Sequence, residues 1–212
     1  MKITLSAIKA DVGGVGGHTK PSKELVETVK KIVSESRLLL DSYIGYTGDD
    51  IHILMSHTRG VNNSEIHKLA FDAFMEATNV AKEQGLYGAG QDMLKTAFSG
   101  NVRGLGPGSA EIEFEERPNE AVMLFAADKT EPGAFNVPLY YVFVEVSRSP
   151  GLMLSNDMRK GVVFTIMDVA NTEADKIIEL KTPEEYVDIA SLLFNPHRFV
   201  IEKIHSRSIT SR

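Results

Sequence analysis

The sequence predicts an α+β fold in which helices pack on a largely antiparallel sheet. Three observations predict it: strand and helix patterns alternate without a strict strand–helix–strand rhythm, two β-like runs are joined by a short acidic turn, and the second half is mainly β-like. The 212 residues show no internal repeat and no linker, so we expect one domain over residues 1–212.

The first half of the chain combines a strand, a hairpin and two helices. Apolar residues alternate along the first strand, whereas they recur at helical spacing in the two helices. The predicted elements are a strand over 3–8, a helix over 25–33 with Ser22 as N-cap, a hairpin of 38–47 and 51–57, and a helix over 66–81 that ends near Gly85.

A glycine-dense segment over residues 85–108 is expected to form a long ordered loop. Beyond it, apolar runs with β-branched and aromatic residues predict further strands, and Thr182-Pro183-Glu184-Glu185 has the form of a capping box that opens a helix. The predicted strands are 121–127, 139–146, 161–169, 176–180 and one around 199–204, and the predicted helix ends near Phe194.

Composition excludes several classes of function. The net charge is −6 without a basic cluster, so we expect no nucleic acid partner. The longest stretch without a charged residue, 132–144, is too short to span a membrane, and the N-terminus does not resemble a signal peptide. Cysteine is absent, which excludes disulfides and thiolate metal sites and fits a reducing cytoplasm. We therefore expect a cytoplasmic protein that binds no membrane.

Polar side chains recur at strand ends and in glycine-rich turns. Carboxylates a few ångströms apart raise one another's pKa, so a cluster of them needs a cation to stay ionised. Mg²⁺ suits such a site, and a pair of ions can polarise a phosphoryl group and activate water. Taken singly, each residue also fits turn chemistry or a solvated strand end. The candidates are Asp11, His18, Asp49, Asp50, Gln91 and Asp128.

Two glycine-rich segments allow more than one interpretation. Residues 13–17 lie between a strand and a helix, where free backbone N–H groups can hold an anion, but left-handed turn geometry is the simpler explanation. No P-loop lysine follows them. In residues 100–108, Arg103 is placed to pair with a phosphate, and a flexible connection is the alternative.

Seven segments resemble the bifunctional fructose-1,6-bisphosphate aldolase/phosphatase family of archaea and deeply branching bacteria. The resemblance is specific because the segments are long and co-linear, and it weakens after about residue 150. They are IKADVG (8–13), GHTKPS (17–22), GDD (48–50), SHTRG (56–60), GLYGAGQD (85–92), FSGNVRGLGPG (98–108) and ADKTEPGA (127–134).

The resemblance implies a layered α-β-β-α sandwich and a Mg²⁺-dependent phosphatase of gluconeogenesis that removes the 1-phosphate of fructose 1,6-bisphosphate. It also implies two or more Mg²⁺ ions and a homo-oligomer, an octamer in that family. Asp11 would be the catalytic base and a metal ligand, and Asp49 would bridge ions. The other implied metal ligands are His18, Asp50, Gln91 and Asp128, and the implied substrate-binding residues are His18, Tyr87, Gly100, Asn101, Asp128 and Lys129.

The resemblance covers the N-terminal half to two-thirds of the family's chains. Their remaining part supplies the Schiff-base lysine of the aldol step, and no matching lysine is present here, so the sequence leaves open whether this chain has aldolase activity. The alternative expectation is a catalytically incompetent form that binds metal and sugar phosphate, or that assembles with the missing C-terminal part.

Overall fold

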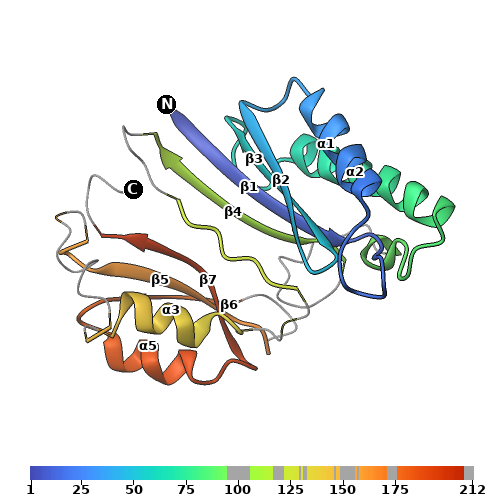
Figure 1. The fold of residues 1–212 in the computed structure, drawn as a ribbon. Helices are drawn as coiled ribbons and strands as arrows, with labels where there is room; N and C mark the ends of the chain where they lie inside the picture. The colour runs from blue at the N-terminus through green and yellow to red at the C-terminus, as the bar shows by residue number, and fades with distance from the viewer. Residues whose placement is uncertain are drawn as a thin grey trace. The chain divides into compact units, whose positions relative to one another are not determined.

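The computed structural model describes residues 1–94, 106–116, 122–128, 130, 133–145, 147–148, 156, 158–170 and 176–207. The chain divides into two compact units, Met1–Lys129 and Thr130–Arg212, here called the first and second units (Figure 1). The single domain expected from the sequence stays a prediction.

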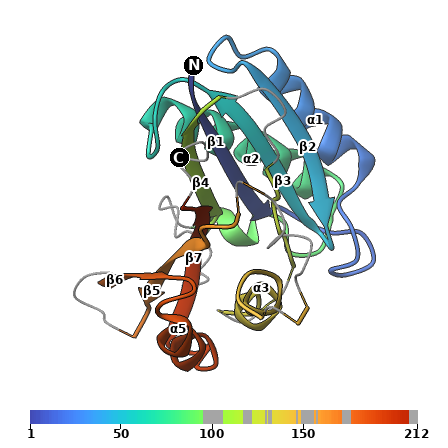
Figure 2. The same cartoon turned by 90° about the vertical axis from the view of Figure 1, so that its left-hand side faces the viewer.

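The first unit is an antiparallel sheet with two helices on one face. The strand order is β2-β3-β1-β4, and all three neighbouring pairs are antiparallel (Figure 2). The elements are β1 (Lys2–Asp11), α1 (Lys23–Ser34), β2 (Asp41–Thr47), β3 (Asp50–His57), α2 (Ser64–Glu83), a 3₁₀ helix η1 (Gln91–Leu94) and β4 (Gly108–Glu115).

Helix α1 begins after the predicted N-cap Ser22, whereas the cap of α2, Asn63, was not predicted. Ser22 accepts a hydrogen bond from the Leu25 N–H, and the side chain of Asn63 caps α2 in the same way. The apolar faces of the helices pack on one face of the sheet, where every second residue of β1 is buried. Phe74 and Ile53 are fully buried there, each contributing about 1.5–3 kcal/mol by leaving water.

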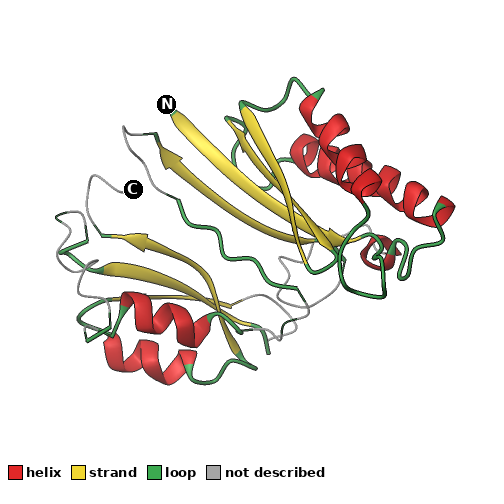
Figure 3. Cartoon of the chain, in the orientation of Figure 1, coloured by secondary structure: helices red, strands yellow, loops and turns green. Residues whose placement is uncertain are grey.

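The second unit is a smaller antiparallel sheet with two helices. The strand order is β6-β5-β7, and Figure 3 distinguishes its strands from α3 and α5. Its separate apolar core includes Phe164, Ile189 and Leu193. The elements are α3 (Asn136–Phe143), β5 (Val162–Asp168), β6 (Lys176–Lys181), α5 (Tyr186–Leu193) and β7 (Phe199–Ser206).

The predicted α+β class with antiparallel sheets is confirmed, but two predicted strands are wrong. The run 139–146 lies largely in helix α3, because its aromatic and β-branched residues pack into the core of the second unit at helical spacing. Residues 122–127 have no regular structure, and no described strand pairs with them, so Val122 and Met123 stay exposed.

Two further features differ from the prediction. Strand β4 was not predicted, although Ala110, Ile112 and Phe114 alternate with polar residues along it. Helix α5 begins at Tyr186 and not at the predicted capping box, because the Thr182 hydroxyl accepts a hydrogen bond from the Val162 N–H of the neighbouring strand.

A buried polar network joins β1, β3, β4 and α2 within the first unit. The Arg59 N–H donates to Nδ1 of His57, so the ring proton is on Nε2, which lies 2.8 Å from the Ser6 hydroxyl. Ser6 in turn donates to Glu111, at 2.5 Å, and Glu111 also accepts from Asn62 N–H and lies 3.2 Å from Nε2 of His67. In this arrangement Ser6 is a relay between two side chains and not a nucleophile.

The electrostatics of the network follow from this arrangement. Burial would raise the pKa of Glu111, but its hydrogen bonds from Ser6, Asn62 and His67 hold that pKa below its usual range. Burial lowers the pKa of His57. The network is therefore stable with an ionised carboxylate and a neutral His57 imidazole.

No helix within the described part of the chain is both long enough and apolar enough to cross a membrane.

Replacing Ser6 by Ala should destabilise the first unit by about 1–3 kcal/mol, because it leaves the His57 N–H and a Glu111 oxygen without their shared buried partner. Denaturant unfolding of the full chain measures this. The control is Ser56→Ala, which removes a hydroxyl bound to the Asp41 carbonyl at the surface and should change stability by less than about 0.5 kcal/mol. Equal losses in the two variants would contradict the buried relay.

The network also makes stability depend on pH. A histidine with a lowered folded-state pKa binds fewer protons when folded, so its contribution is complete above its ordinary value of 6.5 and is lost as the pH falls. Wild-type protein should therefore lose more stability between about pH 7 and about pH 5 than the His57→Gln variant. Exposed His197→Gln is the control and should keep the wild-type slope. A wild-type slope in the His57 variant would show that His57 does not titrate in this way.

Candidate functional site

Antiparallel pairing of β1 with β3 brings three carboxylates to one end of the sheet. Asp11 ends β1 and is paired with Asp50, the first residue of β3, and Asp49 precedes it in the hairpin turn. All three residues are buried. The predicted convergence of acidic strand ends is therefore present within the first unit.

The glycine turn after β1 carries His18 to this end of the sheet. Nδ1 of His18 lies 2.7 Å from Oδ2 of Asp49 and 3.5 Å from Oδ2 of Asp11. Tyr87 packs edge-on against the imidazole, with ring centroids 4.8 Å apart, and its backbone exchanges two hydrogen bonds with Gly14. The imidazole is thereby held between a ring and two carboxylates.

The hydrogen bonds of this turn distinguish, at two of residues 13–17, between an anion site with free N–H groups and simple turn geometry. The N–H of Gly14 donates to the Tyr87 carbonyl, and that of Val15 donates to the Lys20 carbonyl. Those two donors are used within the protein, which favours turn geometry there. Gly14 also has no room for a side chain, because an added Cβ would lie 2.7 Å from Oδ2 of Asp49.

Two groups of side chains have ligand atoms close enough to share a metal ion. Asp11, His18 and Asp49 form one group, and all ligand atoms within it lie within 4.8 Å of one another. The other group combines Asp49 with Asp50 and Asp128 at the same spacing. Asp49 belongs to both groups, which is the position a bridging ligand would occupy.

Two glycines leave room for the side chains at the edges of these groups. Gly48 has a left-handed backbone, with φ of +59°, and an added Cβ would collide with the Asp128 carboxylate. Around Gly88, an added Cβ would lie 3.3 Å from Oε1 of Gln91 and 3.9 Å from Oδ1 of Asp11. Gln91 therefore borders the first group and is exposed, and its predicted role as a metal ligand stays a prediction.

Not every predicted site residue can be placed. Gly100, Asn101 and Lys129 lie outside the described residues, as does Arg103, so their roles remain predictions.

Sequence reasoning missed two residues that contact the cluster. Asp92 accepts a hydrogen bond from the Asp11 backbone N–H at 2.9 Å, where β1 ends. Lys9 donates to Asp50 and, at 2.9 Å, to the carbonyl of Ala127. The sequence spacing could have indicated Lys9, because it lies two residues before Asp11 and therefore on the same face of the strand.

His52 lies opposite Lys9 in the β1–β3 ladder. Burial and the nearby Lys9 ammonium lower the pKa of its imidazole, although Asp128 acts in the opposite direction. Its Nε2 is buried and has no hydrogen-bond partner among the described residues. The imidazole is therefore neutral at pH 7 and adds no positive charge to the cluster.

The donor set fits a hard divalent cation. Carboxylate oxygens dominate it, with one imidazole and one amide oxygen at its edge, and it contains no sulfur ligand. Adjacent buried carboxylates also need positive charge to stay ionised together. The fold and the site together define an α+β protein with a carboxylate centre of the kind that holds divalent metal ions in phosphoryl-transfer enzymes.

The chain belongs to the fructose-1,6-bisphosphatase family, whose sequence profile matches residues 2–212. It is 58% identical over 209 residues to the fructose-1,6-bisphosphate aldolase/phosphatase of Thermus thermophilus, covering 98% of this chain and 58% of that protein. The protein of the same name from Cenarchaeum symbiosum is 57% identical over 207 residues, covering 98% of this chain and 54% of the relative. The chain thus spans about half the length of the curated relatives it matches, and the resemblance expected from the sequence is confirmed.

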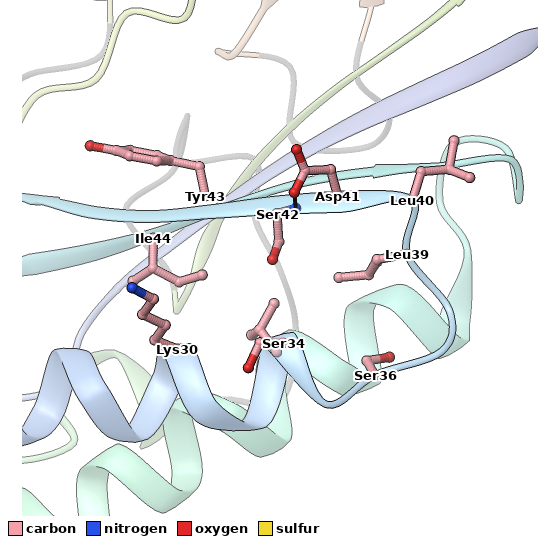
Figure 4. Close-up of a pocket in the computed structure, with 10 residues that line it drawn as sticks. Lys30, Ser34, Ser36, Leu39, Leu40, Asp41, Ser42, Tyr43 and Ile44 are labelled. Atoms are coloured by element: carbon pink, nitrogen blue, oxygen red, sulfur yellow. Dashed lines mark hydrogen bonds between the residues drawn. The ribbon is translucent and has the colours of Figure 1, made fainter.

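A groove elsewhere on the first unit does not belong to this site. It has a volume of about 400 Å³ and lies between the end of α1 and strand β2 (Figure 4). Lys30, Ser34 and Ser42 are among the residues that line it, and none of the predicted site residues is.

Replacing Gly48 by Ala should weaken divalent-metal binding at least about tenfold, because the new methyl group displaces the Asp128 carboxylate. Titration of the metal-free protein with Mg²⁺ measures the affinity. Gly85→Ala is a matched control, since Gly85 has a similar φ of +62° but nothing within 4 Å of an added Cβ. The control should lose about 1 kcal/mol of stability and keep its metal affinity. Equal affinity in both variants would remove Asp128 from the centre.

Proposed function

We propose that this chain catalyses the Mg²⁺-dependent hydrolysis of the 1-phosphate of fructose 1,6-bisphosphate, a step of gluconeogenesis. The observation that carries the proposal is the buried Asp49, which belongs to both candidate metal groups in a chain of the fructose-1,6-bisphosphatase family. The names of the relatives support the substrate, and the donor set supports the metal.

Asp11, His18, Asp49, Asp50, Gln91 and Asp128 would hold two or more Mg²⁺ ions, with Asp49 shared between them. When bound, such ions polarise the phosphoryl group and lower the pKa of bound water. The protein's contribution is to hold the carboxylates in place before the ions arrive. The hydrogen bond that Asp92 accepts from the Asp11 backbone and the pairing of β1 with β3 supply that rigidity.

Asp11 is the proposed base that takes the proton from the attacking water. Its Oδ1 accepts a hydrogen bond from the Gly13 N–H at 3.2 Å, and its Oδ2 faces Nδ1 of His18 at 3.5 Å. We assign proton acceptance to Oδ2, because Oδ1 already accepts the hydrogen bond from the Gly13 N–H. His18 orients both carboxylates and is itself fixed by the Tyr87 ring.

The substrate would lie on the side of the cluster where His18 and Tyr87 are accessible, since both side chains keep solvent contact. Gly100, Asn101, Asp128 and Lys129 are proposed to complete the sugar bisphosphate site, on the strength of the family resemblance. We further propose a cytoplasmic homo-oligomer, an octamer by the same resemblance.

Replacing Asp49 by Asn should abolish Mg²⁺-dependent phosphate release from fructose 1,6-bisphosphate, because one neutral amide then replaces the carboxylate common to both groups. A phosphate-release assay measures the rate. The control is Asp41→Asn, the same change at an exposed position on β2, which should keep the wild-type rate. Unchanged turnover in the Asp49 variant would exclude the site.

The same assay separates the alternative in which the chain binds metal and sugar phosphate without turnover. That alternative predicts calorimetric binding of Mg²⁺ and fructose 1,6-bisphosphate by the wild-type chain with no phosphate release. Phosphate release by the wild-type chain would contradict it.

A further inference from the structure

Lys9 lies diagonally across the β1–β3 ladder from Asp50. In the register, Lys9 is opposite His52 and Asp11 is opposite Asp50, so the four side chains form a patch on one face of the sheet. A diagonal neighbour in an antiparallel pair is within reach of a long side chain. The pairing that places Asp11 beside Asp50 therefore also places a lysine ammonium within reach of Asp50.

The Lys9 ammonium is enclosed and makes two hydrogen bonds. Its Nζ donates to Oδ2 of Asp50 and, at 2.9 Å, to the backbone carbonyl of Ala127. The side chain of Lys9 is 18% exposed and that of Asp50 is 5% exposed, so this is not a solvated surface ion pair. One ammonium thus joins the sheet to a segment more than 100 residues further along the chain.

The segment that Lys9 contacts needs an anchor. Residues 122–127 have no regular structure, and Asp128 follows them directly and packs against Gly48 at the hairpin turn. A ligand on an irregular segment gains no position from a hydrogen-bonded ladder. The bond from Lys9 to Ala127 is a connection of this segment to the sheet one residue before that ligand.

We propose that Lys9 is a positioning residue for the metal centre, which clamps Asp50 to the Ala127 carbonyl and so holds Asp50 and Asp128 toward one shared cation. The inference deepens the proposed function, on whose metal centre it rests. Lys9 acts through the two carboxylates and not on the substrate. The cation that its partners would hold is divalent and bound through oxygen.

Electrostatics alone predicts the opposite effect. A fixed ammonium beside the centre repels a divalent cation, so removing only its charge would strengthen metal binding. Removing a positioning contact instead weakens binding, and lost partners of metal ligands typically cost about 10- to 100-fold in affinity. The direction of the change therefore decides between the two roles.

The test is calorimetric titration of the metal-free 212-residue chain with Mg²⁺, comparing wild type with Lys9→Met and Lys9→Arg. We expect the Met variant to bind Mg²⁺ about 10- to 100-fold more weakly. The Arg variant, which keeps the charge but changes the donor geometry, should fall between Met and wild type. The control is Lys2→Met, at the exposed start of the same strand, which removes the same charge and should change the affinity less than about twofold.

Circular dichroism establishes that each variant is folded, and if the Met variant does not fold, the Arg variant decides. Mg²⁺ affinity in the Lys9 variants equal to or tighter than that of wild type would overturn the proposal, as would a wild-type chain that binds no Mg²⁺. Phosphate release is measured separately. A chain that binds Mg²⁺ in a Lys9-dependent way but releases no phosphate would refute the proposed function and leave the role of Lys9 supported.

Discussion

The pairing of Asp11 with Asp50 across β1 and β3 is the constraint on which the site depends. It brings carboxylates together around Asp49, whose ligand atom lies within 4.8 Å of that of Asp11 in one group and of that of Asp50 in the other. Two ionised carboxylates at that distance repel by about 3.5 kcal/mol at an effective dielectric constant near 20. A register slip by one residue would send one of the two side chains to the other face and disperse the cluster. The strand pairing thus creates a repulsion between carboxylates that neighbouring cationic groups or metal ions must offset.

The rest of the first unit explains how this strain is tolerated. Ile8 and Ala10 alternate with Lys9 and Asp11, so the strand that presents the site is anchored on its other face in the apolar core beneath α1 and α2. At the other end of the ladder, the Ser6 relay ties β1 to β3 and β4 through hydrogen bonds. A register held by both core packing and buried polar contacts resists the slip that carboxylate repulsion favours.

The sequence predicted the parts of the fold that depend on local pattern. Helix α1 and the acidic hairpin are present as predicted because the cap, periodicity and turn residues indicate the same structure at Ser22 and Gly48. It failed at 139–146 and 122–127, where short apolar runs suit helix, strand or loop equally and only tertiary packing decides. Apolar and polar residues alternate clearly along strand β4, but the glycines that precede it are typical of a loop.

The site shows the same division between local chemistry and tertiary arrangement. The sequence predicted that Asp11, His18, Asp49, Asp50 and Asp128 gather, and the structure brings them into two groups, while their roles as metal ligands stay a prediction. Lys9 and Asp92 were not singled out, because lysine is not a common metal ligand and the contacts of both residues exist only in the folded structure. Residue type thus indicates the candidate metal ligands, whereas the strand pairing determines which neighbouring residues hold each candidate in place. The supporting residues of such a centre can be found only after the register that creates the repulsion is known, since the same register brings the lysine beside Asp50.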